Sequence, residues 1–244
     1  MGRARVTHGP DCRHRRYRYR LQPPGPGGQR RPEHGHVEAS VVAELGEQGP
    51  GGGLVPGSVT LIGAVSPPGG DFSEPVTSHT KEIIQTFWAL SKELADARHY
   101  PSVDWVDSFS QDVPVAAGWW AKNISGAWSK RRTEALSLLG RDAELSRIVN
   151  LVGPEALSPA QRWELEGAAL IKEAVLQQSA LDDADSYCSP NKQFELLELV
   201  MQVFDRGKEL IALGAPVQEL AEHPVLARLR RAKSTWRSDE IDQL

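Results

Sequence analysis

Residues 57 to 77 read GSVTLIGAVSPPGGDFSEPVT, and this stretch decides how the chain is divided. Its first part, residues 58–65, has the β-branched residues and the length of a strand buried on both faces. Pro67 and Pro68 cannot continue a ladder of backbone hydrogen bonds, so the strand must end there. The two glycines that follow permit a turn that other residues cannot make. We therefore expect order to begin near Gly57, with a strand that runs into a rigid turn.

The chain after this turn is expected to be mainly helical. Apolar residues at helical spacing predict one amphipathic helix over 76–97. A loop is expected at 98–110, where Pro101 holds Tyr100 in an extended conformation. Helical periodicity returns at 130–153.

Two later helices have strong start signals. Ser158 is placed to cap a helix that has Pro159 at its first position and Gln161 completing a capping box. Ser189 and Pro190 repeat the first two parts of this pattern. The second of these helices places four apolar residues on one face: Phe194, Leu197, Met201 and Phe204.

The first 56 residues differ from the rest in composition and charge. Residues 1–36 hold nine arginines and two acidic residues, a net charge of +7. Since the net charge of the whole chain is −4, the remaining residues carry −11. One interpretation is a basic arm in which Tyr17 and Tyr19 stack on bases. The alternative, which we favour, is a disordered tail or a segment translated from a wrong reading frame. We accordingly expect no nucleic-acid partner.

The whole composition is that of an ordinary globular protein, with 40% hydrophobic and 25% charged residues. Apolar runs fall short of the ~20 residues of a membrane-spanning helix, and the basic N-terminus has no apolar stretch behind it, so we expect a cytoplasmic protein. Cys12 and Cys188 predict neither a disulfide nor a zinc site, and Cys188 is expected to be a reduced thiol. The histidines near Cys12 match no metal-ligand spacing, so no metal site is expected.

No complete catalytic motif is present in the 244 residues. The sequence contains no GxxxxGK[ST], HExxH or GxSxG pattern, and no GxGxxG after a strand. Four acidic residues could be paired as general acid and base, but loop carboxylates more often are solvated or cap helices: Asp71, Glu74, Asp104 and Asp107. The residues alone thus indicate the C-terminal portion of an α/β protein followed by a helical domain.

Several stretches resemble one family, the catalytic A subunits (alpha chains) of V-type and archaeal-type rotary ATPases and ATP synthases. They are the opening stretch, FWALSKELADARHYPSVDW (87–105), IVNLVGPEALSP (148–159) and VLQQSALDDADSYCSPNKQ (175–193). The resemblance covers residues 57–244. It implies the end of a RecA-like P-loop nucleotide-binding domain at 57–112 and a C-terminal helical domain at 113–244, after a non-matching tail at 1–56.

The resemblance also implies an adenine site. Tyr100 matches the aromatic residue that stacks on the adenine ring in this family. The other wall is expected from residues 177–181, with Gln177, Gln178, Ala180 and Leu181. The family pattern there is QQNAF, so Leu181 replaces a phenylalanine and loses ring stacking, worth about 0.5 to 1.5 kcal/mol. Without the resemblance, Tyr100 would be interpreted as a half-buried loop tyrosine.

Contacts with a central rotor are a further implication. In the resembling enzymes the loop matching residues 66–75 faces the rotor, so Asp71 and Glu74 would present negative charge to it. The segment 153–162, with Glu155, matches the lever through which the helical domain pushes on the rotor. The alternatives are a strand-ending turn and a plain helix–loop–helix corner.

The function that follows is part of a proton-translocating ATPase or ATP synthase, peripheral to the cytoplasmic face of a membrane. Its partners would be the central stalk and the B subunit, and its ligands ATP or ADP with Mg²⁺ in the intact enzyme. The chain alone is expected to be inactive, since the phosphate loop and its catalytic residues are absent from the sequence. The alternative is a non-catalytic helical module that binds the same partners without turning over ATP.

Overall fold

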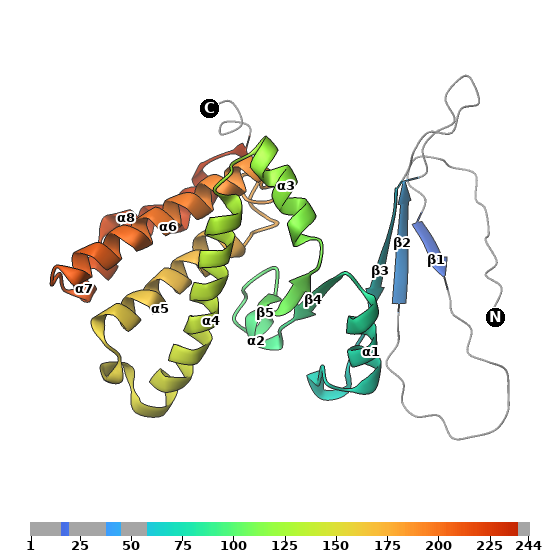
Figure 1. The fold of residues 1–244 in the computed structure, drawn as a ribbon, viewed down its shortest axis with the longest axis horizontal. Coiled ribbons are helices and arrows are strands. Elements are labelled where there is room, and N and C mark those ends of the chain that lie inside the picture. Colours follow the sequence, from blue (N-terminus) through green and yellow to red (C-terminus); the bar gives the residue numbers. More distant parts are fainter. Residues whose placement is uncertain (1–15, 20–37, 45–57, 239–244) are drawn as a thin grey trace. The chain divides into compact units, whose positions relative to one another are not determined.

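The computed structural model describes residues 16–19, 38–44 and 58–238. The chain forms two compact units, Met1–Ile84 and Gln85–Leu244. The order of regions that the family resemblance implies is confirmed: an α/β region comes first in the chain, and a helical region follows (Figure 1).

The first unit contains an antiparallel sheet of three strands in the order β1-β2-β3. Its elements are β1 (Arg16–Tyr19), β2 (Glu38–Glu44), β3 (Ser58–Ala64), the 3-10 turn η1 (Pro68–Gly70) and α1 (Pro75–Ile83). In the register of the pairs, Arg16 lies opposite Val42 and Glu38 lies opposite Ala64. Strand β3 thus occupies the predicted position and ends before Pro67.

One prediction for this unit needs correction, that of a strand β3 buried on both faces. Strands β1 and β2 also lie inside the segment 1–56, for which the sequence predicted no strand. The other residues of 1–56 lie outside the described part of the chain. Strand β3 is not buried on both faces, since Ile62 is 53% exposed.

The turn after β3 is built as its residues predict. Gly69 and Gly70 both have left-handed backbone angles, with φ of 66° and 76°, and only glycine adopts these without strain. Glu74 then caps α1 by accepting hydrogen bonds from the backbone N–H groups of Val76 and Thr77, at 3.1 and 2.6 Å. Pro75 at the first helical position completes this start.

The second unit begins with a two-stranded antiparallel sheet, which the sequence did not predict. Its first elements are β4 (Thr86–Leu90), α2 (Lys92–Asp96), β5 (Val103–Ser110) and α3 (Val113–Asn123). The single helix expected over 76–97 is therefore wrong, as is the loop expected at 98–110. The physical reason is pairing: β4 and β5 bring Phe87 and Phe109 into a stacked contact with ring centres 5.9 Å apart.

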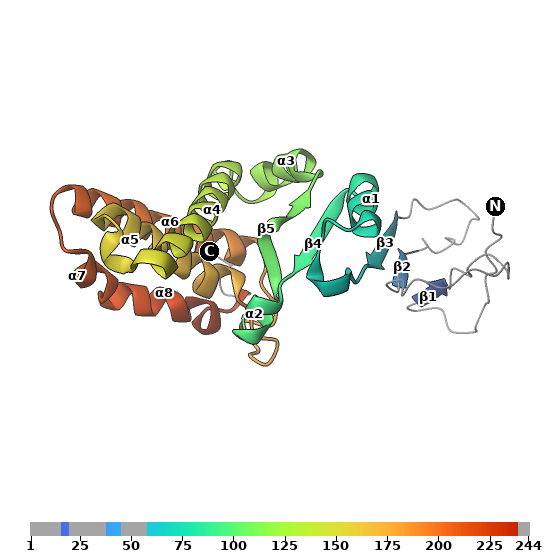
Figure 2. The ribbon, with the colours of Figure 1, turned by 90° about the horizontal axis from the view of Figure 1, so that it is seen from below.

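The helical part holds the core of this unit. Its elements are α4 (Trp128–Val152), the 3-10 turn η2 (Pro154–Ala156), α5 (Pro159–Ile171), the π-helical turn η3 (Lys172–Leu176), α6 (Pro190–Ala212), α7 (Val217–Ala221) and α8 (Pro224–Thr235). Helices α4, α5 and α6 pack side by side, and α8 lies along α5 and α6 (Figures 1 and 2). The capping box at Ser158 and the Ser189 cap are both present, which confirms the two predicted helix starts.

Trp163 of α5 is the centre of the helical core. It is 2% exposed, its ring stacks on Phe204 of α6, and its indole N–H donates to the Phe204 carbonyl at 2.9 Å. Gly207 of α6 leaves room for the indole: a Cβ there would overlap the Trp163 ring. The close approach of α5 and α6 thus depends on a glycine facing a tryptophan.

Candidate functional site

The segment after η3 meets the turn that carries Tyr100. The backbone N–H of Gln178 donates to the Tyr100 carbonyl at 2.7 Å. The Gln177 side-chain amide donates to the Arg98 carbonyl, with a longer distance of 3.4 Å. Residues about 79 positions apart in sequence are therefore joined by hydrogen bonds, and the structure brings together Tyr100, Gln177 and Gln178.

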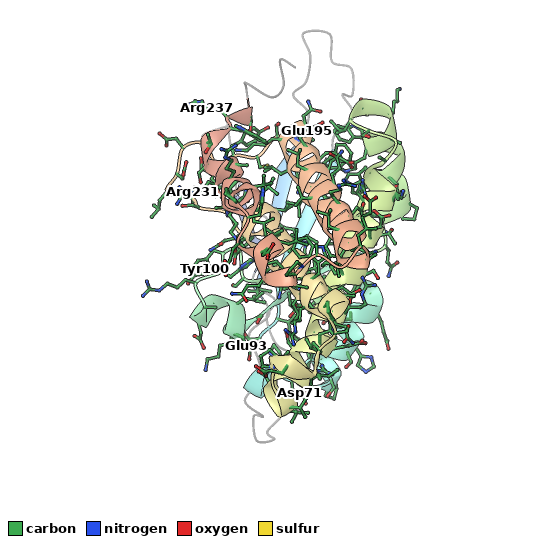
Figure 3. All side chains as sticks on the ribbon, turned by 90° about the vertical axis from the view of Figure 1, so that its left-hand side faces the viewer. Asp71, Glu93, Tyr100, Glu195, Arg231 and Arg237 are labelled. Atoms are coloured by element: carbon green, nitrogen blue, oxygen red, sulfur yellow. The ribbon has the colours of Figure 1, made fainter. Side chains whose placement is uncertain are left out.

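The side chains of this site differ in exposure. Tyr100, labelled in Figure 3, is 52% exposed. Its hydroxyl donates to the Ala95 carbonyl at 3.4 Å. Ala180 is exposed, and Leu181 is 98% exposed. Leu181 therefore lies on a turn that projects into solvent, closed by the Leu181 N–H donating to the Ser179 hydroxyl at 3.3 Å.

Charged residues that no sequence motif marks hold this turn in place. The carboxylate of Asp185, 2% exposed, accepts a hydrogen bond from the Ser179 N–H at 2.7 Å. The Asp185 carbonyl accepts from the Gln178 side chain at 3.2 Å. Lys233 of α8 donates to the Gln177 carbonyl at 2.5 Å and lies 3.9 Å from the Asp185 carboxylate.

Lys192 fixes the other end of the same loop. It is fully buried at the third position of α6, and its ammonium donates to the carbonyls of Ala184 and Lys233. A lysine at a helix N-terminus opposes the helix dipole, so this position was the one sequence signal that could have indicated a special role. The sequence alone could not name its partners, because one of them comes from α8.

The environment shifts several pKa values around Tyr100. Burial lowers the pKa of Lys233, and the neighbouring carboxylate of Asp185 opposes that shift. The pKa of His99 is lowered by burial first and then by the positive charges of Lys233 and Lys172. His99, whose ring packs edge-on against Trp105 with centres 5.7 Å apart, is therefore neutral at pH 7. Burial also raises the pKa of the Cys188 thiol, which forms no disulfide.

The acidic residues predicted to face a rotor lie in different units. In the first unit, the exposed Asp71 carboxylate accepts from the Ser73 N–H at 2.9 Å and from the Ser73 hydroxyl at 2.6 Å. The side-chain hydrogen bond from Ser73 lowers the pKa of Asp71, and that from Thr77 lowers the pKa of Glu74. Both carboxylates are consequently ionised at pH 7, and Glu74 has the additional structural role of capping α1.

Glu155 belongs to the second unit. It is exposed within η2, and its backbone carbonyl accepts a hydrogen bond from the Arg162 guanidinium at 3.4 Å. The same guanidinium donates to the Leu157 carbonyl at 3.2 Å, which ties the turn to the start of α5. The Glu155 carboxylate therefore lies on an exposed turn whose backbone is held by hydrogen bonds from Arg162.

Metal clusters and membrane-spanning helices are both missing from residues 16–19, 38–44 and 58–238. Among these residues, no group of three or more His, Cys, Asp or Glu side chains could hold a metal ion. In that same part of the chain, no helix has the length and apolar character needed to cross a membrane.

Two family models match the chain. The nucleotide-binding domain of the ATP synthase alpha/beta family matches residues 38–110, and the C-terminal domain of V and A type ATP synthase matches residues 117–219. The first match begins before Gly57, inside the segment that was expected not to match.

Curated relatives agree with these models. The chain is 66% identical over 193 residues to the V-type ATP synthase alpha chain of Nitrosococcus oceani, covering 79% of this chain and 32% of that protein. It is 47% identical over 190 residues to the corresponding A subunit of the A-type ATP synthase of Ignicoccus hospitalis, covering 77% and 32%. A solved structure titled as a unique ATP synthase subunit NeqB from Nanoarcheaum equitans covers 57% of this chain and 33% of that one, with a TM-score of 0.47 and 24% identity.

The chain spans about a third of the length of the curated relatives it matches. The matched regions include the two segments of the candidate adenine site and the capped helices α5 and α6. Over these regions the chain is a homologue of the A subunit, or alpha chain, of the V-type and A-type ATP synthases.

Proposed function

We propose that this chain acts as the C-terminal part of the catalytic A subunit of a rotary enzyme that couples ATP hydrolysis or synthesis to proton transport. The observation that carries the proposal is the hydrogen bond from Gln178 to the Tyr100 carbonyl, because it joins the end of the α/β region to the helical region at one site. The relatives are named as ATP synthase subunits, which supports the same function for this chain.

In this proposal, Tyr100 provides an aromatic face for adenine. Gln177 and Gln178 form the facing segment, and Ala180 and Leu181 continue it on the exposed turn. Tyr100 is 52% exposed, and aromatic stacking is the main contribution that its ring can make. Affinity for ATP or ADP is expected to be weak, since the strongest contacts in such enzymes are made to the phosphates.

In nucleotide sites Mg²⁺ is commonly held by one or two carboxylates together with the phosphates of the nucleotide. The 244 residues contain no GxxxxGK[ST] loop to position those phosphates, and no group of three or more acidic, histidine or cysteine side chains is found among the described residues. We therefore assign no magnesium ligand to these residues. In this proposal the purified 244-residue chain does not hydrolyse ATP.

The partners in this proposal are the central stalk and the B subunit of the complex, at the cytoplasmic face of a membrane. Asp71, Glu74 and Glu155 are proposed to present charge to the rotor. Each carboxylate is ionised or exposed and stands on a turn stiffened by glycine, proline or hydrogen bonds, which suits an electrostatic contact with a basic partner surface.

The test is a titration of the purified chain with ADP, measured by calorimetry, with the variant Tyr100→Ala and the matched control Tyr187→Ala. Tyr187 is also exposed, at 68%, but is not part of the proposed site. Loss of stacking should weaken ADP binding by roughly tenfold in the first variant only. Equal affinity of Tyr100→Ala and the unmodified chain would contradict the adenine role.

Absence of any response to ADP, together with capture of stalk subunits or the B subunit by the chain, would instead favour a non-catalytic interaction module.

A further inference from the structure

The C-terminal helix α8 contacts the proposed adenine-facing segment through one side chain. Lys233 of α8 lies 56 residues from Gln177 in the sequence, yet its ammonium donates to the Gln177 carbonyl. Gln177 is the first residue after the π-helical turn η3, where helix carbonyls lack intrahelical partners and attract cations. Lys233 therefore satisfies the end of the preceding helix at the point where the segment departs toward Tyr100.

The same ammonium faces the carboxylate that holds the next part of the segment. Asp185 lies 3.9 Å from Lys233, and its side chain is 3% exposed where that of Lys233 is 13% exposed. Asp185 accepts from the Ser179 N–H at 2.7 Å. Lys233 and Asp185 thus hold the backbone on the two sides of Gln178, the residue whose N–H bonds to Tyr100.

Lys192 adds a third charged residue to this arrangement, and we call Lys233, Asp185 and Lys192 together the frame of the segment 177–179. The buried ammonium of Lys192 donates to the Lys233 backbone carbonyl at 2.7 Å and to the Ala184 carbonyl, so it links the end of α8 to the loop beside Asp185. Figure 2 shows α8 running beside α6, the helix that begins with Lys192 in its first turn. These contacts fix the backbone of α8 at Lys233, whose side chain then contacts residues 177–179 from a defined position.

We propose that Lys233 is a positioning residue for the adenine site: with Asp185, it sets where residues 177–179 lie relative to Tyr100. The inference rests on the proposed function for its ligand, adenine, but the position of the segment is a property of the free chain. Lys233 touches no substrate in this proposal and acts through the backbone of Gln177.

The experiment compares Lys233→Met, which removes the cation and keeps most of the aliphatic length, with Arg228→Met as the matched control. Arg228 is an exposed cation on the same helix. Amide hydrogen exchange of the full chain, resolved by NMR, reports Gln178 and Ser179 directly, while Val200 and Met201 in α6 report the core. We expect exchange at Gln178 and Ser179 to speed up by about tenfold or more in Lys233→Met, with Val200 and Met201 unchanged.

A conservative variant separates positioning from simple loss of packing. Lys233→Arg keeps a positive donor and should restore exchange to within about threefold of the unmodified chain. If Lys233→Met does not fold, Lys233→Gln, which keeps a donor without the charge, is measured in its place. Unchanged exchange at Gln178 and Ser179 would overturn the proposal, as would equal acceleration throughout α6.

Titration with ADP then distinguishes this inference from the proposed function. If the unmodified chain binds ADP, Lys233→Met should weaken the affinity by roughly tenfold, Lys233→Arg should restore it, and Arg228→Met should leave it unchanged. If the unmodified chain shows no ADP binding, the proposed function fails for this chain. The exchange data still decide whether Lys233 positions the segment.

Discussion

Arg131 of α4 holds three carboxylates at once. Its guanidinium forms two parallel hydrogen bonds to Glu198 of α6, at 2.8 and 2.9 Å, and further bonds to Glu134 and Asp205. The Arg131 and Glu198 side chains are only 14% and 19% exposed. Because bidentate charged pairs that are shielded from water are among the stronger polar contacts, this pair fixes the packing of α4 against α6.

At this scale we predict that Glu198→Gln lowers the free energy of unfolding by about 1.5 to 3 kcal/mol at pH 7. The reason is that Arg131 loses its bidentate partner. Urea unfolding followed by circular dichroism measures the change. The control is Glu195→Gln, an exposed residue on the same helix, labelled in Figure 3, which should change stability by less than about 0.5 kcal/mol.

The same pair predicts a dependence on pH. The hydrogen bond from Arg131 lowers the pKa of Glu198 in the folded chain. A lowered folded pKa contributes stability that is present above the unfolded pKa and is lost as pH falls through the folded value. The stability difference between the unmodified chain and Glu198→Gln should hold from pH 7 to about 5 and shrink on further acidification. A difference that grows in acid would contradict this assignment.

Two kinds of residue define helices α5 and α6: capping residues set where each helix begins, and glycines allow the two helices to pack closely. Ser158 and Ser189 each cap a helix whose first position is proline. Between the two helices that these caps begin, Gly207 lies against Trp163 and Gly167 against Phe204. The caps decide where α5 and α6 start, and the glycines decide how closely they pack.

Substitution of two glycines should therefore act in opposite directions. In Gly207→Ala the new methyl group would overlap the Trp163 ring, so we expect a loss of roughly 1 to 3 kcal/mol in unfolding free energy. In Gly140→Ala, within α4, the methyl group meets open space, and a gain of up to about 1 kcal/mol is expected from helix propensity. Thermal unfolding of both variants tests the pair; equal effects would refute the packing argument.

Removal of a cap is a smaller perturbation at the same scale. Ser158→Ala deletes the hydroxyl that accepts from the Gln161 N–H at 3.3 Å, so we expect a loss of about 1 kcal/mol. Chemical denaturation of this variant should be compared with that of Ser137→Ala, an exposed serine inside α4. A cost at Ser137 as large as that at Ser158 would argue against capping as the cause.

The main buried cluster of the described residues lies within one unit. Every residue of the main buried cluster in the described part of the chain lies between Ala135 and Leu226, inside the unit Gln85–Leu244. The first unit contributes a sheet, a turn and α1, whose buried residue is Thr77. Stability of the helical region is therefore expected to be independent of residues before Gln85.

The prediction at this scale is that residues 85–244, produced alone, unfold with the melting temperature of the full chain, to within about 3 °C. Circular dichroism at 222 nm follows the helices in both proteins. A markedly lower melting temperature for 85–244 would mean that the first unit stabilises the second through contacts that the core does not include.

The features that depend on neighbouring residues could be predicted from the sequence. The Pro67–Gly70 turn, the starts of α5 and α6 and the order of an α/β region before a helical region all follow from capping, backbone angles and periodicity, which are local properties. The family could be recognised for the same reason, since its motifs are contiguous stretches, and the family model and the curated relatives confirm it.

The features that need a distant partner could not be predicted from the sequence and are seen only in the folded chain. Strands β4 and β5 exist because they pair with each other, and helical spacing of single residues in 76–97 gave no sign of that pairing. Tyr100 and Gln178 could be named from the resemblance, but their hydrogen bond and the frame of Lys233, Asp185 and Lys192 join loops, α6 and α8. Such buried charges are tolerated only where partners satisfy them, and those partners meet only in the folded chain.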